Sequence, residues 1–112
     1  MADILRGSIH WADLDPTVGR EQSGRRPVLI LSENIFNRHS GTVIAVAITS
    51  QEPKANYPLT SEIVGTGLPK QSWAKMSQVR TLSVTRIGDK IASATTNEME
   101  IVLAGLNEIL GG

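Results

Sequence analysis

The chain is organised around residues 21–31, which read Glu21-Gln22-Ser23-Gly24-Arg25-Arg26-Pro27-Val28-Leu29-Ile30-Leu31. Four consecutive apolar residues at 28–31, preceded by turn-forming residues, predict a buried strand. Gly24 lets the preceding chain turn sharply, and Pro27 biases Arg26 towards an extended backbone. We therefore expect a loop that ends where the strand begins, with Arg26 in an extended conformation at the start of the strand. The alternative is that Arg25 and Arg26 are solvated loop charges, as most loop charges are.

The composition is that of an ordinary globular protein, with 112 residues of which 40% are hydrophobic and 20% are charged. This length predicts one domain over residues 1–112, modest in stability on its own. The chain has no cysteine, which excludes disulfides and thiolate metal sites and suits a reducing cytoplasm. Its longest apolar run, residues 43–48, is far too short to cross a bilayer, and no signal-peptide core stands at the start. We expect a cytoplasmic protein without membrane association.

The charges are unevenly distributed although the formal net charge is zero. Residues 20–90 carry ten Lys or Arg against five Asp or Glu, a net charge of +5, and the two ends together carry −5. A basic middle between acidic ends is compatible with a polyanion bound at a local patch. The alternative is that the asymmetry arose by chance.

Short strands separated by turn residues dominate the remaining pattern. We expect strands at residues 7–14, 27–31, 42–49, 59–64, 72–81 and 87–92, with a mobile polar loop at 51–58. A short helical turn capped by Ser32 should cover residues 32–38. Thr95 and Glu98 form a capping box before an amphipathic helix that Gly111 ends. Five to seven strands followed by one helix predict a small, strongly bent sheet or barrel with the helix packed on it.

The residue patterns of several enzyme classes are missing. His10 and His39 are far apart and stand in no cluster with metal-ligand spacing, so we expect no metal ion. We expect His10, in its strand, to be a packed or surface residue rather than a ligand. The sequence contains no phosphate-binding loop, dinucleotide fingerprint or Gly-x-Ser-x-Gly nucleophile elbow, and we expect no cofactor.

Two groups of polar residues remain as candidates for chemistry. One is the loop with Glu21, Arg25 and Arg26, and the other is Thr49-Ser50-Gln51, where the most β-prone strand ends. If the strands at 27–31 and 42–49 pair antiparallel, the start of the first lies beside the end of the second. A guanidinium, a hydroxyl and a carboxylate would then share one pocket. Such a set of groups can bind a phosphodiester, because the arginine donates two hydrogen bonds to its oxygens and the threonine donates another.

Several segments of the chain resemble the MazF/PemK family of toxins from type II toxin–antitoxin systems. The resemblance rests on Trp11-Ala12-Asp13-Leu14-Asp15-Pro16, on Gly19 to Leu29, on Val46-Ala47-Ile48-Thr49-Ser50-Gln51, and on Ser77-Gln78-Val79-Arg80-Thr81. These segments occur in the family's order and spacing, and the final helix also resembles that family. The likeness therefore extends over nearly the whole chain.

The resemblance implies a small SH3-like barrel of the CcdB/PemK type with a C-terminal helix, working as a homodimer. The implied activity is ribosome-independent, sequence-specific and metal-independent cleavage of single-stranded RNA, namely mRNA. Attack by the ribose 2′-hydroxyl would leave a 2′,3′-cyclic phosphate and a 5′-hydroxyl. The implied partner is a cognate MazE-like antitoxin whose flexible tail covers the RNA groove.

The resemblance also assigns roles to single residues. Arg26 and Thr49 match the family's catalytic arginine and threonine, Glu21 an acidic position close to them, and Gln78 a base-contacting position. Arg25 falls where members of the family vary, so we give it only an electrostatic role. Because arginine does not deprotonate in proteins, we expect Arg26 to stabilise the transition state and Glu21 or a bound water to act as base. Ser50 and Gln51 are expected to bind RNA, and Tyr57 to stack on a base.

Two other function classes stay open at this point. A CcdB-like toxin that binds and inhibits DNA gyrase uses the same barrel type but does not require the Arg26–Thr49 pair. A catalytically inactive interaction module is the third possibility, which only an assay separates from the others.

Overall fold

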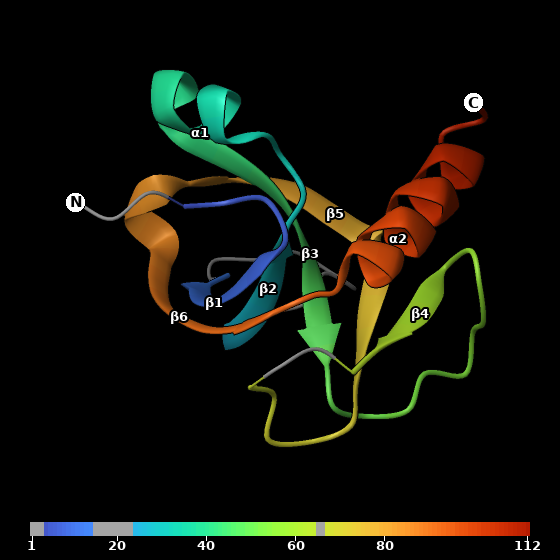
Figure 1. The fold of residues 1–112 in the computed structure, drawn as a ribbon. Coiled ribbons are helices and arrows are strands. Elements are labelled where there is room, and N and C mark those ends of the chain that lie inside the picture. The colour runs from blue at the N-terminus through green and yellow to red at the C-terminus, as the bar shows by residue number, and fades with distance from the viewer. Residues whose placement is uncertain (1–3, 15–23, 65–66) are drawn as a thin grey trace.

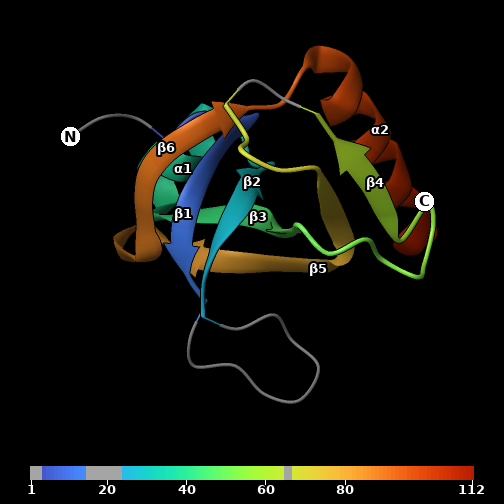
Figure 2. The same cartoon turned by 90° about the horizontal axis from the view of Figure 1, so that it is seen from below.

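One antiparallel sheet contains every strand of the computed structural model, which describes residues 4–14, 24–64 and 67–112 (Figure 1). The strands are β1 Ser8–Asp13, β2 Arg25–Ile30, β3 Thr42–Thr49, β4 Thr60–Ile63, β5 Ser72–Ser83 and β6 Ile87–Ser93. The helices are α1 Asn34–Ser40, the 3-10 turn η1 Val84–Arg86 and α2 Thr96–Ile109. The order across the sheet is β4-β5-β3-β2-β1-β6, and Figure 2 shows how strongly the sheet curves. The predicted small β fold with a C-terminal helix is confirmed. Within the described residues, its barrel is open between β4 and β6.

The apolar residues of β2 and β3 alternate between two clusters. Leu29 and Val46 belong to the first cluster, which also receives Met76 of β5 and Val102 of α2. Val28, Ile30, Ala45 and Ala47 belong to the second, together with Ala12, Leu14, Val43 and Leu82. The register pairs Val28 with Ala47 and Leu29 with Val46, so opposite residues share a face, as antiparallel pairing requires. Burial on both faces explains the continuous apolar runs in these strands.

Strand β2 begins earlier than its sequence suggests. We expected a strand from Pro27, but Arg25 and Arg26 are already paired with Asp13 and Ala12 of β1. The two arginines therefore stand in the ladder and not in the loop before it. Pro27 is tolerated within the strand, which it constrains to an extended backbone. Of the loop that we expected at residues 21–27, residues 21–23 lie outside the described part of the chain.

A register shift divides β5 into two halves. Val46 of β3 is opposite Val79, whereas its neighbour Ala47 is opposite Lys75, so three residues of β5 are absorbed between the two pairs. The first half of β5 pairs with β4 as well as with the end of β3. Such irregularities bend a strand and increase its twist. The shift also changes which residues of β5 share a face.

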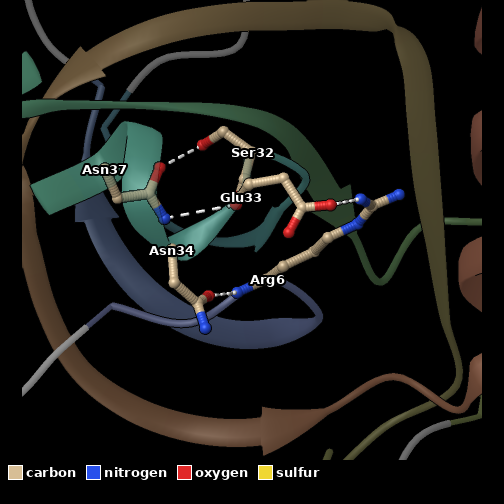
Figure 3. A network of polar contacts seen from close by, with 5 residues as sticks. All are labelled: Arg6, Ser32, Glu33, Asn34 and Asn37. Atoms are coloured by element: carbon tan, nitrogen blue, oxygen red, sulfur yellow. Dashed lines mark hydrogen bonds and ion pairs between the residues drawn. The ribbon is translucent and has the colours of Figure 1, made fainter. Parts of the chain in front are cut away.

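A polar network ties α1 to the N-terminal segment (Figure 3). The Arg6 side chain forms an ion pair with Glu33, and its backbone N–H donates to Asn34 Oδ1 across 3.1 Å. Asn37 is buried and donates to the Ser32 carbonyl oxygen across 3.2 Å. Our prediction that Ser32 caps the helix was wrong. Its hydroxyl instead donates to Asn37 and accepts from the Ile44 N–H, which ties the start of α1 to β3.

Helix α2 begins and ends where its sequence predicts. Thr95 accepts from the Glu98 N–H and the Glu98 side chain accepts from the Thr95 N–H, which is the predicted capping box. Gly111 follows the helix with a φ of 82°. The helix packs on β4 and β5 through Val102 and partly buried residues of the first cluster (Figure 1). Within the described residues, neither helix is long and apolar enough to span a bilayer.

His10 is a packed residue, as predicted. Its side chain is buried between β1 and β6, where Nδ1 lies 3.0 Å from the Gly88 carbonyl oxygen and Nε2 lies 3.0 Å from Ser8 Oγ. The structure describes no group of three or more His, Asp or Glu residues that could hold a metal ion.

Candidate functional site

Arg26 and Thr49 lie on the same face of neighbouring strands. Arg26 continues the row of Val28 and Ile30 on β2, and Thr49 continues the row of Ala45 and Ala47 on β3. All four of these apolar residues belong to the second cluster, so strand alternation places Arg26 and Thr49 on the side of that cluster. The β2–β3 register, continued to the strand ends, puts the two residues opposite each other. The guanidinium and the hydroxyl therefore stand at one edge of a rigid apolar surface.

The Thr49 side chain is buried, and its hydroxyl has a defined orientation. The backbone N–H of Gln51 donates to Thr49 Oγ1 across 3.2 Å. Since the oxygen accepts this bond, the hydroxyl proton is left to donate to another group. The local turn after β3 thus presents Thr49 as a hydrogen-bond donor.

Lys75 and Arg80 add positive charge to this face, and sequence reasoning did not single them out for the site. Lys75 is opposite Ala47 and Arg80 is opposite Ala45, so both project to the side of the second cluster. In a regular strand, residues 75 and 80 would point to opposite faces because the alternation has a period of two. Because of the register shift in β5, residues 75 and 80 point to the same face. No local pattern in the sequence predicts this shift. Arg80 also donates to the Leu14 carbonyl oxygen across 3.4 Å.

Arg25 is not brought to the same face as Arg26. Arg25 directly precedes Arg26 in β2, so its side chain points to the opposite face of the sheet. Its guanidinium lies over the Trp11 ring, 5.3 Å from the ring centroid, in a cation–π contact. This arrangement limits Arg25 to a contribution through its charge.

The other predicted site residues are distributed around the end of β3. Ser50 and Gln51 are exposed directly after Thr49, and Gln78 is half-buried within the irregular part of β5. Glu21 lies outside the described residues. Tyr57 stands in the 51–58 loop, where its side chain is 48% exposed. The site roles of all these residues stay predictions.

The Tyr57 ring joins the loop to α2. Its Cε2 lies so close to Gly105 that a Cβ on that glycine would be 3.2 Å away, and the Pro58 carbonyl oxygen would be 3.1 Å away. The Tyr57 hydroxyl also donates to the Glu108 carboxylate. Desolvation by neighbouring atoms, then this hydrogen bond and the charge of Glu108, raise the pKa of Tyr57 above its usual value of 10.0. The loop is therefore held against the C-terminal helix.

Two cavities flank the sheet. One of about 210 Å³ lies beneath the loop and is lined by Trp73 of β5 and Glu62 of β4, with Tyr57 and neighbouring loop residues. The other, of about 620 Å³, lies between the N-terminal segment, α1 and β6 and contains none of the predicted site residues. Its asparagines at 34 and 37 and its His10 already bond within the protein. The smaller cavity adjoins the site, because Trp73 is the β5 partner of Thr49.

Curated proteins of similar sequence are endoribonucleases by name. The chain is 41% identical to Endoribonuclease EndoA of Bacillus subtilis (strain 168) over 101 residues, covering 88% of this chain and 87% of that protein. It is 37% identical to Endoribonuclease MazF of Staphylococcus saprophyticus over 110 residues, covering 96% of this chain and 92% of that protein.

Solved structures with the same fold come from the same group of proteins. MazF from Deinococcus radiodurans superposes over the full length of both chains with a TM-score of 0.88 and 26% identity. An endoribonuclease in complex with its cognate antitoxin, from a mycobacterial species, superposes with a TM-score of 0.79 and 27% identity, covering 96% of this chain and 95% of that one. Residues 5–110 match the family described as PemK-like, MazF-like toxin of type II toxin-antitoxin system. The chain belongs to this toxin family.

Proposed function

We propose that the protein is the toxin of a type II toxin–antitoxin system, and that it cleaves single-stranded RNA in a sequence-specific and metal-independent reaction. The observation that carries this proposal is the common face of Arg26 and Thr49 at the ends of two paired strands. The names of the two curated relatives, both endoribonucleases, support the same activity.

In the proposed reaction, the 2′-oxygen of a ribose attacks the adjacent phosphorus and the bond from phosphorus to the 5′-oxygen breaks. The 2′-hydroxyl gives its proton to a base, and the leaving 5′-oxygen takes up a proton. The products are a 2′,3′-cyclic phosphate and a 5′-hydroxyl. Deoxyribose has no 2′-hydroxyl, so DNA is not a substrate.

Arg26 and Thr49 stabilise the charge that develops on the phosphoryl oxygens. The planar guanidinium of Arg26 donates two parallel hydrogen bonds to these oxygens. The Thr49 hydroxyl, whose oxygen already accepts from Gln51, donates a third. Because a guanidinium stays protonated, Arg26 acts only as a stabiliser of the developing charge, and the leaving oxygen takes its proton from a bound water. Glu21 or a bound water takes the proton from the 2′-hydroxyl.

Single-stranded RNA suits the surface around this pair. Lys75 and Arg80 extend the positive charge of Arg26 along one face, which attracts the phosphate backbone. Unpaired bases expose their faces and edges to side chains such as Gln78 and Tyr57. Cleavage of mRNA then stops translation and growth.

The partners follow from the family and its relatives. The mycobacterial endoribonuclease is in complex with its cognate antitoxin, and we propose that a MazE-like antitoxin binds this chain. We further propose that the chain works as a homodimer in the cytoplasm.

The test is RNA cleavage by the purified protein in excess EDTA. We expect a mixed-sequence RNA to be cut and end-group analysis to find cyclic phosphate. The Arg26→Ala and Thr49→Val variants should lose cleavage, whereas Arg38→Ala on α1 and Thr81→Val on an exposed site of β5 keep it. Intact RNA beside trapped gyrase–DNA complexes would contradict the proposal and favour a CcdB-like gyrase inhibitor.

A further inference from the structure

A row of side chains leads from Thr49 across the sheet to Glu62. Thr49 is opposite Trp73 of β5, and Trp73 is in turn opposite Glu62 of β4. Directly opposite residues in antiparallel strands project to the same face. With neighbouring strands about 5 Å apart, the row extends about 10 Å from the Thr49 hydroxyl.

The end of this row is the floor of the 210 Å³ cavity. Trp73 and Glu62 line it from the sheet, and the loop adds Glu52, Asn56 and Tyr57. The cavity therefore combines two aromatic rings with two carboxylates and one amide. Thr60 and Ser61 line it as well, so the lining is mainly polar and can hydrogen-bond to the edge of a ligand that lies against the aromatic rings.

The wall of the cavity is held in place by bonds within the chain. Thr60 Oγ1 donates to the Ala55 carbonyl oxygen across 2.7 Å, and the Leu59 N–H donates to the Asn56 carbonyl oxygen across 2.9 Å. Tyr57 packs on Gly105 at the other side of the loop. The cavity is thus formed before any ligand enters.

The Glu62 carboxylate is oriented by a neighbour. Gln71 Nε2 donates to Glu62 Oε2 across 2.8 Å. A carboxylate only accepts hydrogen bonds, so the Glu62 side of the cavity favours a ligand edge that donates. Adenine, cytosine and guanine each carry an exocyclic amino group, which is such a donor. Uracil instead presents two carbonyl oxygens beside one N–H, and these oxygens are repelled by a carboxylate.

We propose that this cavity receives one unpaired base of the RNA next to the scissile phosphate, stacked on Trp73, and that Glu62 selects a base with an amino group and rejects uracil. This inference rests on the proposed nuclease activity and names a specificity pocket for it. Stacking of bases on aromatic side chains with readout of their edges is the general mode of single-strand recognition.

The first test is a profile of cleavage sites on a long transcript of random sequence. We expect the wild-type protein to disfavour uracil at one position beside the cut, and Glu62→Gln to relax this preference by roughly ten-fold, because an amide can also donate. Trp73→Ala should lose discrimination at the same position and raise KM, and Trp73→Phe should restore both. Glu100→Gln on the exposed side of α2 is the matched control and should leave the profile unchanged.

The second test uses the fluorescence of Trp73 itself. The chain has two tryptophans, so Trp11→Phe leaves Trp73 as the reporter. Short RNAs with deoxyribose at the cleaved position bind without being cut. We expect one position at which adenine, cytosine or guanine quenches Trp73 more strongly than uracil does.

The outcomes separate the two proposals. If Glu62→Gln cuts RNA with an unchanged base profile, or if Trp73 fluorescence does not respond to the base, the pocket is refuted while the nuclease activity stands. If the wild-type protein leaves all RNA intact, the nuclease proposal fails and the pocket fails with it.

Discussion

The Gln51 N–H donates a hydrogen bond to Thr49 Oγ1 across 3.2 Å, at the point where β3 ends. This bond couples the first turn of the 51–58 loop to the hydroxyl that we assign to catalysis. It makes the orientation of the Thr49 hydroxyl a property of the loop as well as of the strand.

Thr49→Val should abolish catalysis by removing this hydroxyl while keeping the shape of the side chain. We expect a loss of about 100- to 1,000-fold in kcat, the usual cost of one transition-state donor. The Gln51 N–H also loses its acceptor, which costs about 1 kcal/mol of stability. Thr49→Ser retains the hydroxyl and should restore both properties. Single-turnover cleavage and thermal unfolding measure the two effects, and a fully active Thr49→Val variant would contradict the assignment.

Arg26→Lys should not substitute for arginine, although the charge is preserved. The ammonium of lysine cannot donate two parallel hydrogen bonds to the phosphoryl oxygens. We expect a loss of about 100-fold or more in kcat, with a smaller change in KM. Arg38→Lys, at an exposed position of α1, is the control for the same chemical change. Equal kinetics of Arg26→Lys and wild type would show that only the charge matters.

Lys75→Gln should weaken RNA binding at all sequences alike. Lys75 lies on the same face as Ala47 and contributes charge without a defined base contact. Loss of one phosphate contact should reduce the slope of log K against log salt by about 0.7 for a single strand. Binding of an uncleavable RNA at several salt concentrations gives this slope. An unchanged slope would place Lys75 outside the RNA path.

Gly105→Ala should destabilise the protein although alanine favours helices. A Cβ at this position would lie 3.0 Å from Met76 Cε and 3.1 Å from the Pro58 carbonyl oxygen. Overpacking of this kind costs about 1–3 kcal/mol, more than the gain of about 1 kcal/mol in helix propensity. Asn107→Ala, exposed on the same helix, controls for propensity and should not destabilise. Denaturant unfolding compares the stabilities of the two variants. A stabilised Gly105→Ala variant would show that Tyr57 and Pro58 move away from the added methyl group at little cost in free energy.

Alkaline pH should release the contact between Tyr57 and α2. The folded-state pKa of Tyr57 is raised above 10.0, so its contribution to stability is complete below that value and disappears as the pH rises through the folded pKa. Tyr57 is the only tyrosine of the chain, so the absorbance of tyrosinate reports its titration directly. Glu108→Gln removes the negative charge and should lower the pKa of Tyr57. An unchanged titration in this variant would exclude Glu108 as a cause.

The bounds of most strands were predictable from alternation and turn residues. The strand Thr42–Thr49 was predicted with the observed bounds. The capping box was predicted with the two residues that form it, Thr95 and Glu98. The start of β2 was less predictable, because the pairing of Arg25 and Arg26 with β1 comes from residues more than ten positions away. Ser32 was assigned to a cap because its local pattern allows one. In the folded chain the Ser32 hydroxyl bonds to Asn37 and to the Ile44 N–H instead of capping the helix.

The sequence by itself determined which residues form strands and helices, and that Arg26 and Thr49 stand at strand ends. These properties depend on side-chain alternation, caps and turns, which are relations between near neighbours in the chain. Only the tertiary structure decided that Lys75 and Arg80 share the face of that pair, that Trp73 connects Thr49 to Glu62, and that Tyr57 rests on Gly105. Each of these three relationships depends on the register or packing of segments that are far apart in the sequence. The free energy of the whole fold sets that register and packing, so no pattern of neighbouring residues predicts them.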